Sequence, residues 1–351
     1  MSVLNNYPFL AVLKTFYAKN PLHHCLKNDK ICPKLSFEFF ANLAFDSEDV
    51  GACISLMVNL ITLFIAQQQS NDCLSQHLNQ LLNGEIITAV ANNEAFHHGS
   101  NLNAMTSCIK FNSDSSFDIV INKPLITNAG AADLVIASVP IEGKAKNQFA
   151  MLLFEGSEIQ QKCFSEQLSG LRSCPTGSIS AQYKNIRNIR LVTEVRRSLL
   201  VMRQIYNMER FLLGCIMTGI LKKILHYALK EMDDDVHEKF ANQYLQNKIL
   251  SIFEALIRLE SLVKNCIDSM EKGNPTESIL SIIKLSCIND VGKSIILLKE
   301  ICGGKSYFKN HITSKLLADH EALNNLGGTR ELMKQTLWQT LKNHKIRNLY
   351  V

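Results

Sequence analysis

Residues 300–332 read EICGGKSYFKNHITSKLLADHEALNNLGGTREL, and this stretch decides the organisation of the chain. It contains two diglycines, Gly303-Gly304 and Gly327-Gly328. Glycine adopts positive φ angles without steric cost, so each pair predicts a tight turn. We therefore expect one helix to end at the first pair and a short amphipathic helix to carry Asp319. A last helix should begin at Thr329, ten residues after Asp319.

The composition is that of an ordinary globular enzyme. The 351 residues are 46% hydrophobic and 20% charged, and the net charge of +5 is too small to indicate nucleic-acid binding. Eleven cysteines occur without CxxC pairs, and the start of the chain lacks a basic segment and a cleavage site. The sequence therefore predicts reduced thiols in a cytoplasmic protein. The histidines and cysteines between positions 23 and 32 fit no standard zinc spacing, so no metal is expected.

One uncharged segment, residues 51–71, raises the question of a membrane span. Its apolar part is about 16 residues long and ends in three glutamines, whereas a bilayer requires roughly 20 apolar residues. We therefore expect a buried core helix and no membrane span.

The hydrophobic periodicity changes twice along the chain and predicts three parts. Residues 1–84 show helical patterns, at 7–18, 36–43, 47–69 and 71–83. Residues 85–196 carry short β-type runs, at 86–91, 107–111, 117–121, 134–139, 149–153 and 186–192, which predict a small antiparallel barrel or sandwich. Residues 197–351 return to helical spacing, at 199–231, 240–271, 276–301 and 329–342, and predict a four-helix bundle. The expected fold class is α+β, with domains at 1–84, 85–196 and 197–351.

The order and spacing within residues 300–332 resemble the C-terminal signature of the acyl-CoA dehydrogenases. In that family a G-G-x-G-[YF] turn, an arginine–aspartate pair and a Y-E-G-T or Y-G-G-T turn follow at these intervals. Residues 93–101, NEAFHHGSN, resemble its T-E-P-x-x-G-S-D loop with one insertion, and residues 125–134, LITNAGAADL, its W-I-T-N-x-x-x-A-D strand entry. The resemblance covers about residues 43–341. It implies a shortened N-terminal helical domain, a central antiparallel β domain and a C-terminal four-helix bundle.

The resemblance also implies an FAD site. Asn93 stands where a flavin-contacting threonine is usual, Leu125 replaces the tryptophan, and Thr127 keeps the hydroxyl near flavin N5. The other positions that match the family's cofactor contacts are Gly99, Ser100, Gln243, Gly303, Gly304 and Thr329.

The chemistry of the family requires a carboxylate that removes the α-proton of an acyl thioester while a hydride leaves the β-carbon. The usual glutamate position is Gly327, but isovaleryl- and long-chain-type enzymes place the base on the first helix of the bundle, just before an arginine. Glu209 and Arg210 occupy that place here, with Arg210 and Gly327 as expected substrate contacts. Glu209 is flanked by Met208 and by apolar residues 211–213, a setting that raises a carboxyl pKa. The alternative is an ordinary surface or salt-bridged helix glutamate.

Several positions depart from the family pattern. Glu231 and Asp233–Asp235 form an acidic run where the family has an arginine-led flavin contact, with Met232 at the arginine position. Glu300 replaces a glutamine and Ala318 an arginine. Because acidic groups oppose a pyrophosphate, these substitutions weigh against FAD binding.

Three hypotheses therefore stay open. The first is an FAD-dependent dehydrogenase of an acyl thioester, carried on CoA or on an acyl carrier protein. The second is a degenerate, non-catalytic member that acts as a thioester-binding or partner subunit. The third is a flavoprotein of the same fold with other chemistry, such as oxygen activation.

The expected partners follow from the same resemblance. The family assembles as dimers and tetramers, so a homodimer or homotetramer is expected, and an electron-transfer protein could accept the electrons. Basic residues gather at the boundary of the second and third parts, and are either a solvated hinge or an anion site for a phosphate or an acidic carrier protein. These residues are Lys184, Arg187, Arg190, Arg196, Arg197 and Arg203.

Overall fold

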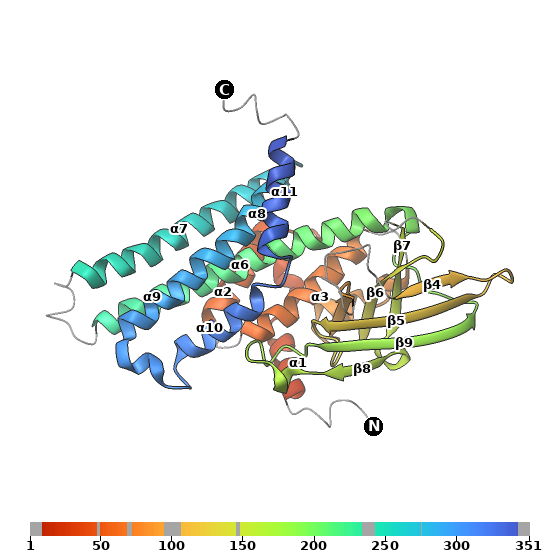
Figure 1. Ribbon diagram of the computed structural model, residues 1–351, viewed down its shortest axis with the longest axis horizontal. Coiled ribbons are helices and arrows are strands. Elements are labelled where there is room, and N and C mark those ends of the chain that lie inside the picture. The colour runs from red at the N-terminus through yellow and green to blue at the C-terminus, as the bar shows by residue number, and fades with distance from the viewer. Residues whose placement is uncertain are drawn as a thin grey trace. The chain divides into compact units, whose positions relative to one another are not determined.

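The computed structural model describes residues 9–47, 50–68, 72–94, 107–144, 148–233, 243–274 and 276–342. The chain packs as two compact units (Figure 1). The first, called the β unit, comprises Met1–His24, Ile54–Leu168 and Arg172–Ile205, and the second, called the helical unit, comprises Cys25–Cys53, Ser169–Leu171 and Tyr206–Val351.

The β unit contains two sheets. Strands β3 (Thr88–Ala91), β6 (Leu134–Pro140) and β7 (Phe149–Glu155) form one sheet in the order β3-β6-β7. Strands β4 (Cys108–Phe111), β5 (Phe117–Ile126), β9 (Gly177–Ile186) and β8 (Gln160–Cys163) form the other, in the order β4-β5-β9-β8 (Figure 1). The apolar faces of both sheets contribute to one core that includes Ile119, Ile121, Val135, Leu152 and Ile179.

Two details of the β prediction are corrected. The pair β3–β6 is parallel, whereas every other described strand pair is antiparallel. The chain leaves β3, builds the β4–β5 hairpin in the other sheet and then returns, and such a long crossover permits a parallel pair. The strand expected at 186–192 is wrong, because β9 ends at Ile186 and only an isolated bridge between Leu152 and Leu191 follows.

Helices also belong to the β unit. They are α1 (Phe9–Lys19), most of α3 (Val50–Gln68), α4 (Asp72–Ser75) and α5 (Leu78–Leu82). Tyr17 on α1 is fully buried, and its hydroxyl lies 2.7 Å from Ser55 Oγ on α3, which in turn donates to Asn128 Oδ1 at 2.5 Å. This buried chain of hydrogen bonds ties both helices to the end of β5.

Within the described residues, two helical stretches are long and apolar enough to cross a membrane by length and composition alone, α3 and Val195–Met232. In the structure 83% and 72% of their apolar windows are buried inside the protein. The buried core helix expected at 51–71 is therefore present. The helix predicted at 47–69 is α3, whose observed bounds are Val50–Gln68.

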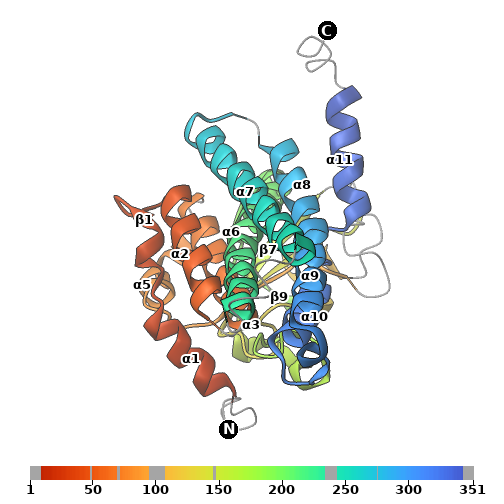
Figure 2. The same ribbon diagram turned by 90° about the vertical axis from the view of Figure 1, so that its left-hand side faces the viewer.

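The helical unit is built from long helices that lie side by side, as Figure 2 shows for α6, α7 and α9. Its helices are α2 (Pro33–Asp46), most of α6 (Ser198–Asp233), α7 (Gln243–Glu271), α8 (Glu277–Ser286), α9 (Gly292–Cys302), α10 (Ile312–Leu323) and α11 (Arg330–Lys342). A small hairpin, β1 (Leu26–Lys27) with β2 (Lys30–Ile31), precedes α2. The single helix expected at 276–301 is α8 and α9 joined by a π-helical segment, η7 (Cys287–Val291). After the first diglycine the 3₁₀ turn η8 (Gly303–Tyr307) leads toward α10, so both turns predicted from 300–332 are present.

Candidate functional site

Glu209 lies on α6 within the helical unit and contacts the second diglycine turn. The backbone N–H of Gly327 donates to Glu209 Oε1 at 3.1 Å. Glu209 is half-buried, and its neighbours Met208, Phe211 and Leu212 are buried. The carboxyl therefore lies against apolar packing and has a defined hydrogen bond, unlike a free surface glutamate.

Arg210, the next residue on α6, holds the same turn from its other side. Its Nε donates to the Gly327 carbonyl at 2.9 Å, and its Nη1 lies 3.4 Å from Asn207 Oδ1. Gly327 has a φ of +70°, and a Cβ there would lie 3.1 Å from Leu213 Cδ1. Glycine is therefore the residue that this turn requires. The structure thus brings three predicted site residues, Glu209, Arg210 and Gly327, into contact.

The electrostatics of this cluster depend on a residue that the sequence reasoning missed. Burial raises the pKa of the Glu209 carboxyl, while the charges of Lys284 and Arg210 and the Gly327 N–H act in the opposite direction. Lys284 lies on α8, is 1% exposed, and donates to the Leu323 carbonyl at 2.8 Å. Burial lowers the pKa of Lys284 to about 8. A lysine at a helical core position, in the run Ile282-Ile283-Lys284-Leu285, was the available sequence signal.

The helix that leads to this turn is itself anchored. Asp319 on α10 is buried and accepts a hydrogen bond from the Leu171 N–H at 2.7 Å. A Cβ on Gly170 would lie 2.2 Å from the Ala318 carbonyl oxygen, so only glycine permits this approach. In the sequence Asp319 served only to mark the spacing to Thr329. In the structure it fixes α10 through its hydrogen bond to the Leu171 backbone N–H.

Gln243, Gly303 and Gly304 lie at the opposite end of the helical unit. Gln243 begins α7 and is exposed, and a Cβ on either glycine would meet no atom within 4 Å. Lys305 Nζ lies 2.9 Å from Glu231 Oε2, so this group neighbours the C-terminal end of α6. Glu209 is 22 residues earlier on the same helix, which corresponds to about 33 Å. Thr329 belongs with the turn at Gly327, where its Oγ1 accepts from the Leu332 N–H at 3.3 Å.

The described acidic residues at that end are both paired with lysines. Lys248 Nζ lies 2.5 Å from Glu300 Oε2, and Lys305 pairs with Glu231. These ion pairs offset the negative charges of Glu231 and Glu300, which were expected to oppose the FAD pyrophosphate. Residues 234 and 235 lie outside the described residues, as does the side chain of Asp233.

The β unit gathers a second group of predicted cofactor residues where β3 and β5 end. Asn93 is exposed, and its Nδ2 donates to the Leu125 carbonyl at 3.4 Å. Leu125 is 59% exposed with a φ of +50°, and Thr127 is half-buried two residues later. Leu125 thus presents an exposed apolar side chain next to the Asn93 amide, and a surface of this kind could contact a flavin ring. Gly99 and Ser100 lie outside the described residues.

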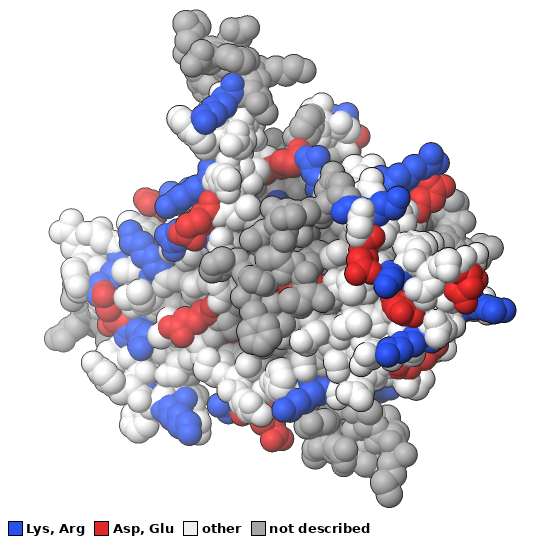
Figure 3. All heavy atoms as spheres, turned by 45° about the vertical axis from the view of Figure 1, so that its right-hand side comes forward, with Lys and Arg blue, Asp and Glu red and all other residues white. Residues whose placement is uncertain are grey.

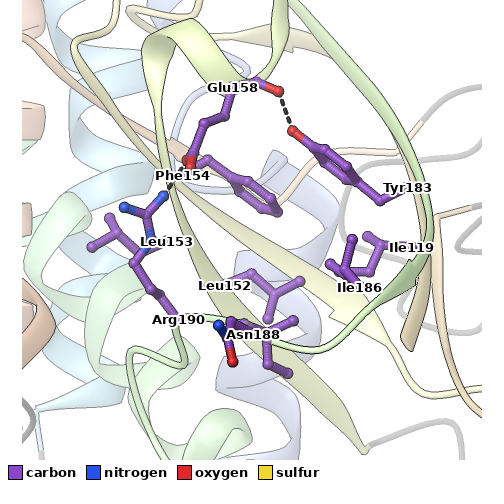
Figure 4. Close-up of a pocket in the computed structure, with 10 residues that line it drawn as sticks. Ile119, Leu152, Leu153, Phe154, Glu158, Tyr183, Ile186, Asn188 and Arg190 are labelled. Carbon is purple, nitrogen blue, oxygen red and sulfur yellow. Dashed lines mark hydrogen bonds and ion pairs between the residues drawn. The ribbon is translucent and has the colours of Figure 1, made fainter. Parts of the chain in front are cut away.

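A separate pocket of about 390 Å³ lies in the β unit (Figure 4). Leu152 and Phe154 from β7, Ile119 from β5 and Tyr183 and Ile186 from β9 line it. At its rim Arg190 pairs with Glu155 and Glu158, and the Tyr183 hydroxyl donates to the Glu158 carbonyl. Ile119 is six residues before Leu125 along β5, or about 20 Å. The pocket therefore holds none of the predicted site residues, and its cation is already neutralised.

The basic residues at 184–203 do not form a uniform patch. Arg190 is committed to two glutamates, and Arg196 Nε lies 2.6 Å from Glu194 Oε2. On the face drawn in Figure 3, basic and acidic side chains are interspersed. Among the described residues no group of three or more His, Cys, Asp or Glu side chains could hold a metal ion.

Comparison with known proteins identifies the fold. The protein-family model for the acyl-CoA dehydrogenase C-terminal domain matches residues 199–342. No curated protein matches the chain at a significant level. Among solved structures, the FAD complex of PigA has a TM-score of 0.84 at 16% identity, covering 95% of this chain and 89% of that one. The prolyl acyl carrier protein oxidase AnaB has a TM-score of 0.82 at 16% identity, covering 95% and 91%.

Butyryl-CoA dehydrogenase from Megasphaera elsdenii has a TM-score of 0.81, again at 16% identity, covering 95% of this chain and 90% of that chain. The predicted resemblance and the predicted fold class are therefore confirmed, in a chain whose sequence has diverged far from these neighbours.

Proposed function

Because this chain has the acyl-CoA dehydrogenase fold and carries that family's C-terminal domain, we propose that it catalyses the FAD-dependent α,β-dehydrogenation of an acyl thioester. Glu209 is the proposed general base. The observation that carries this proposal is the Glu209 carboxyl itself, which lies beside apolar packing, accepts the Gly327 N–H at 3.1 Å, and has a pKa raised by burial. A raised carboxyl pKa brings a general base closer to neutral pH, where proton transfer is most effective.

In the proposed reaction the Glu209 carboxylate takes the α-proton of the acyl group. Bound FAD would supply the acceptor for the hydride that leaves the β-carbon, and a carbon–carbon double bond would form between the α- and β-carbons. The Gly327 N–H orients the carboxylate, and the missing side chain of Gly327 leaves room beside Glu209, because a Cβ there would lie 4.0 Å from Glu209 Cδ. Arg210 holds the carbonyl of the same turn, so we propose that it positions Gly327, and a direct substrate contact stays a prediction.

The proposed flavin contacts in the β unit are Asn93, Leu125 and Thr127, together with Gly99 and Ser100. Gln243, Gly303, Gly304 and Thr329 are proposed contacts in the helical unit. Support comes from the exposed arrangement of Asn93 and Leu125 and from the pairing of Glu231 and Glu300 with lysines.

The test is the reductive half-reaction of Glu209→Gln. The purified protein is reconstituted with FAD and mixed without oxygen with saturated acyl-CoA esters and with acyl carrier protein thioesters. Flavin bleaching should be about 10²–10⁴-fold slower in Glu209→Gln than in the wild type, because the variant keeps size and hydrogen bonding but loses the proton acceptor. Glu254→Gln is the matched control, since Glu254 is an exposed glutamate on α7, and it should retain the wild-type rate.

The same experiment separates the alternative function. A colourless wild-type protein after reconstitution, or bleaching that is equal with Glu209 and with Gln, would contradict the dehydrogenase. Leu125 at the tryptophan position is the observation that favours the alternative, a non-catalytic thioester-binding or partner subunit. The neighbour AnaB is described as a prolyl acyl carrier protein oxidase, which supports including carrier-bound substrates. We also propose a cytoplasmic location with reduced thiols, since none of the eleven cysteines, all within the described residues, forms a disulfide.

A further inference from the structure

A buried lysine on another helix, Lys284, influences the charge of the proposed base. Lys284 on α8 is 1% exposed, which is rare for a lysine unless it is paired. Its Nζ donates to the carbonyl of Leu323, the last residue of α10, at 2.8 Å. Leu323 is four residues before Gly327, whose N–H donates to Glu209. Lys284 therefore anchors the beginning of the segment that ends at the Glu209 contact.

The two helices that carry this pair approach each other closely. A Cβ on Gly214 of α6 would lie 2.6 Å from Ile283 Cγ2 of α8. Gly214 is five residues after Glu209, and Ile283 adjoins Lys284. The close approach leaves little space for solvent between the helices, so a charge on one is weakly screened from a charge on the other.

Resting on the proposed function, we propose that Lys284 is a positioning residue, which anchors the Leu323–Gly328 segment and keeps the Glu209 carboxylate ionised and ready to accept a proton. The Lys284 charge is the largest of the influences that offset the effect of burial on the Glu209 pKa. Without it, a carboxyl in this position would be protonated over a wider pH range and could not act as a base there.

The other described titratable groups that face the pair are few. The charge of Arg210 lowers the pKa of Glu209. Tyr206 on α6 and Glu277 on α8 both act on the pKa of Arg210, and Glu209 acts on that of Tyr206. Cys287 in η7 acts on Lys284, and burial raises the pKa of that thiol to about 12, so it stays neutral. His320 on α10 lies close enough for Lys284 to affect its pKa, which burial lowers, so it is neutral at pH 7 and adds no charge.

The experiment follows the carboxyl directly and needs neither flavin nor substrate. The protein is labelled with glutamate carrying ¹³C at the carboxyl, and the Glu209 signal is assigned by its loss in Glu209→Gln. Its titration midpoint is then compared in wild type, Lys284→Gln and Lys284→Arg. Glutamine can still donate to the Leu323 carbonyl but carries no charge, whereas arginine keeps both properties. Lys223→Met is the matched control. Lys223 is a buried lysine on α6, and like Lys284 it donates to a backbone carbonyl, in this case that of Ser47.

We expect the Glu209 midpoint to rise by about one pH unit in Lys284→Gln, the lower end of the range for an adjacent opposite charge. It should stay within a few tenths of a unit in Lys284→Arg and in Lys223→Met. In a plot of the dehydrogenation rate against pH, the rise on the acidic side should move to higher pH by the same amount in Lys284→Gln. A Glu209 midpoint that does not move in Lys284→Gln would overturn the inference, whereas a moved midpoint in a protein without dehydrogenase activity would contradict only the proposed function.

A reciprocal measurement covers the case in which Lys284→Gln does not fold. Coupling between two sites is mutual, so the loss of the Glu209 charge must lower the Lys284 midpoint below its value of about 8 by the same shift. The lysine ε-carbon signal of Lys284 in Glu209→Gln reports this shift. An unchanged Lys284 midpoint in Glu209→Gln would also overturn the inference.

Discussion

At the scale of single residues, Glu209 illustrates the tension between a useful base and a stable fold. Burial raises its pKa, so the native protein prefers the protonated carboxyl and is penalised when the carboxyl ionises. A folded pKa above the unfolded value of 4.5 means that this penalty grows as the pH rises from 4.5 through the folded pKa. The same charge that makes Glu209 a candidate base therefore costs stability near neutral pH.

Glu209→Gln should for this reason be more stable than the wild type at pH 8, by about 0.5–2 kcal/mol. At pH 5 the difference should shrink, because a larger fraction of the wild-type carboxyl is protonated there than at pH 8. Urea denaturation followed by circular dichroism at both pH values measures the two free energies of unfolding. A variant that is less stable than the wild type at pH 8 would show that the Gly327 hydrogen bond outweighs the burial of the charge.

The residues of the candidate site differ in how well the sequence could predict them. Glu209 and Gly327 were accessible because their motifs stand at the family's spacing, and their contact follows once α6 and the turn are both present. Lys284 was not, because hydrophobic periodicity treats a lysine as a surface residue. Only the packing of α6 on α8 reveals that the face carrying Leu280, Lys284 and Cys287 points inward.

At the scale of elements, the long periodic helices were predictable and the shorter strands less so. The α7 pattern at Ile252, Leu259 and Val263 predicted a helix at 240–271; the observed helix is Gln243–Glu271, and residues 240–242 lie outside the described residues. The strand was predicted one segment too late, because residues 186–192 contain four aliphatic residues whereas β9 alternates buried Ile179 with more exposed polar residues. The π-helical segment η7 within 276–301 contains no proline or glycine from which the interruption could be predicted.

The contact of residues 169–171 with α10 gives a test at this scale. Gly170→Ala should lower the free energy of unfolding by about 1–3 kcal/mol, because its Cβ would lie 2.2 Å from the Ala318 carbonyl oxygen and backbone must move. Gly304→Ala is the matched control, since a Cβ there meets no atom within 4 Å. Thermal unfolding of both variants measures the difference, and equal melting temperatures would contradict the close packing at Gly170.

At the scale of the whole molecule, the proposed cofactor contacts of the helical unit are too widely separated to serve one reaction centre. Thr329 follows the Gly327 turn that contacts Glu209, near the start of the part of α6 in this unit, whereas Gln243, Gly303 and Gly304 lie near Glu231 at its end, about 33 Å away. If both groups bind flavin, the second group must serve a flavin in another copy of the chain. The predicted oligomer would then be a requirement for cofactor binding and not only an assembly.

The exposed face of α7 is where we expect part of that contact. Leu250, Phe253 and Ile257 are 55%, 46% and 48% exposed and lie on one side of the helix, an arrangement typical of an interface core. Light scattering of the wild type at micromolar concentration should give at least twice the chain mass of 39.5 kDa. Phe253→Glu should shift the mass toward a single chain, because an interface core tolerates an unpaired charge poorly.

Val12→Glu is the control for this last prediction, since Val12 on α1 is 71% exposed and lies in the β unit. It should leave the mass unchanged. FAD retention by Phe253→Glu, measured by absorbance after gel filtration, then decides whether the second group of residues serves a neighbouring copy. Retention should fall together with the mass, because separation of the copies removes Gln243, Gly303 and Gly304 from the flavin. A wild type that is monomeric, or a monomeric variant that keeps its flavin, would show that one chain binds the cofactor without those residues.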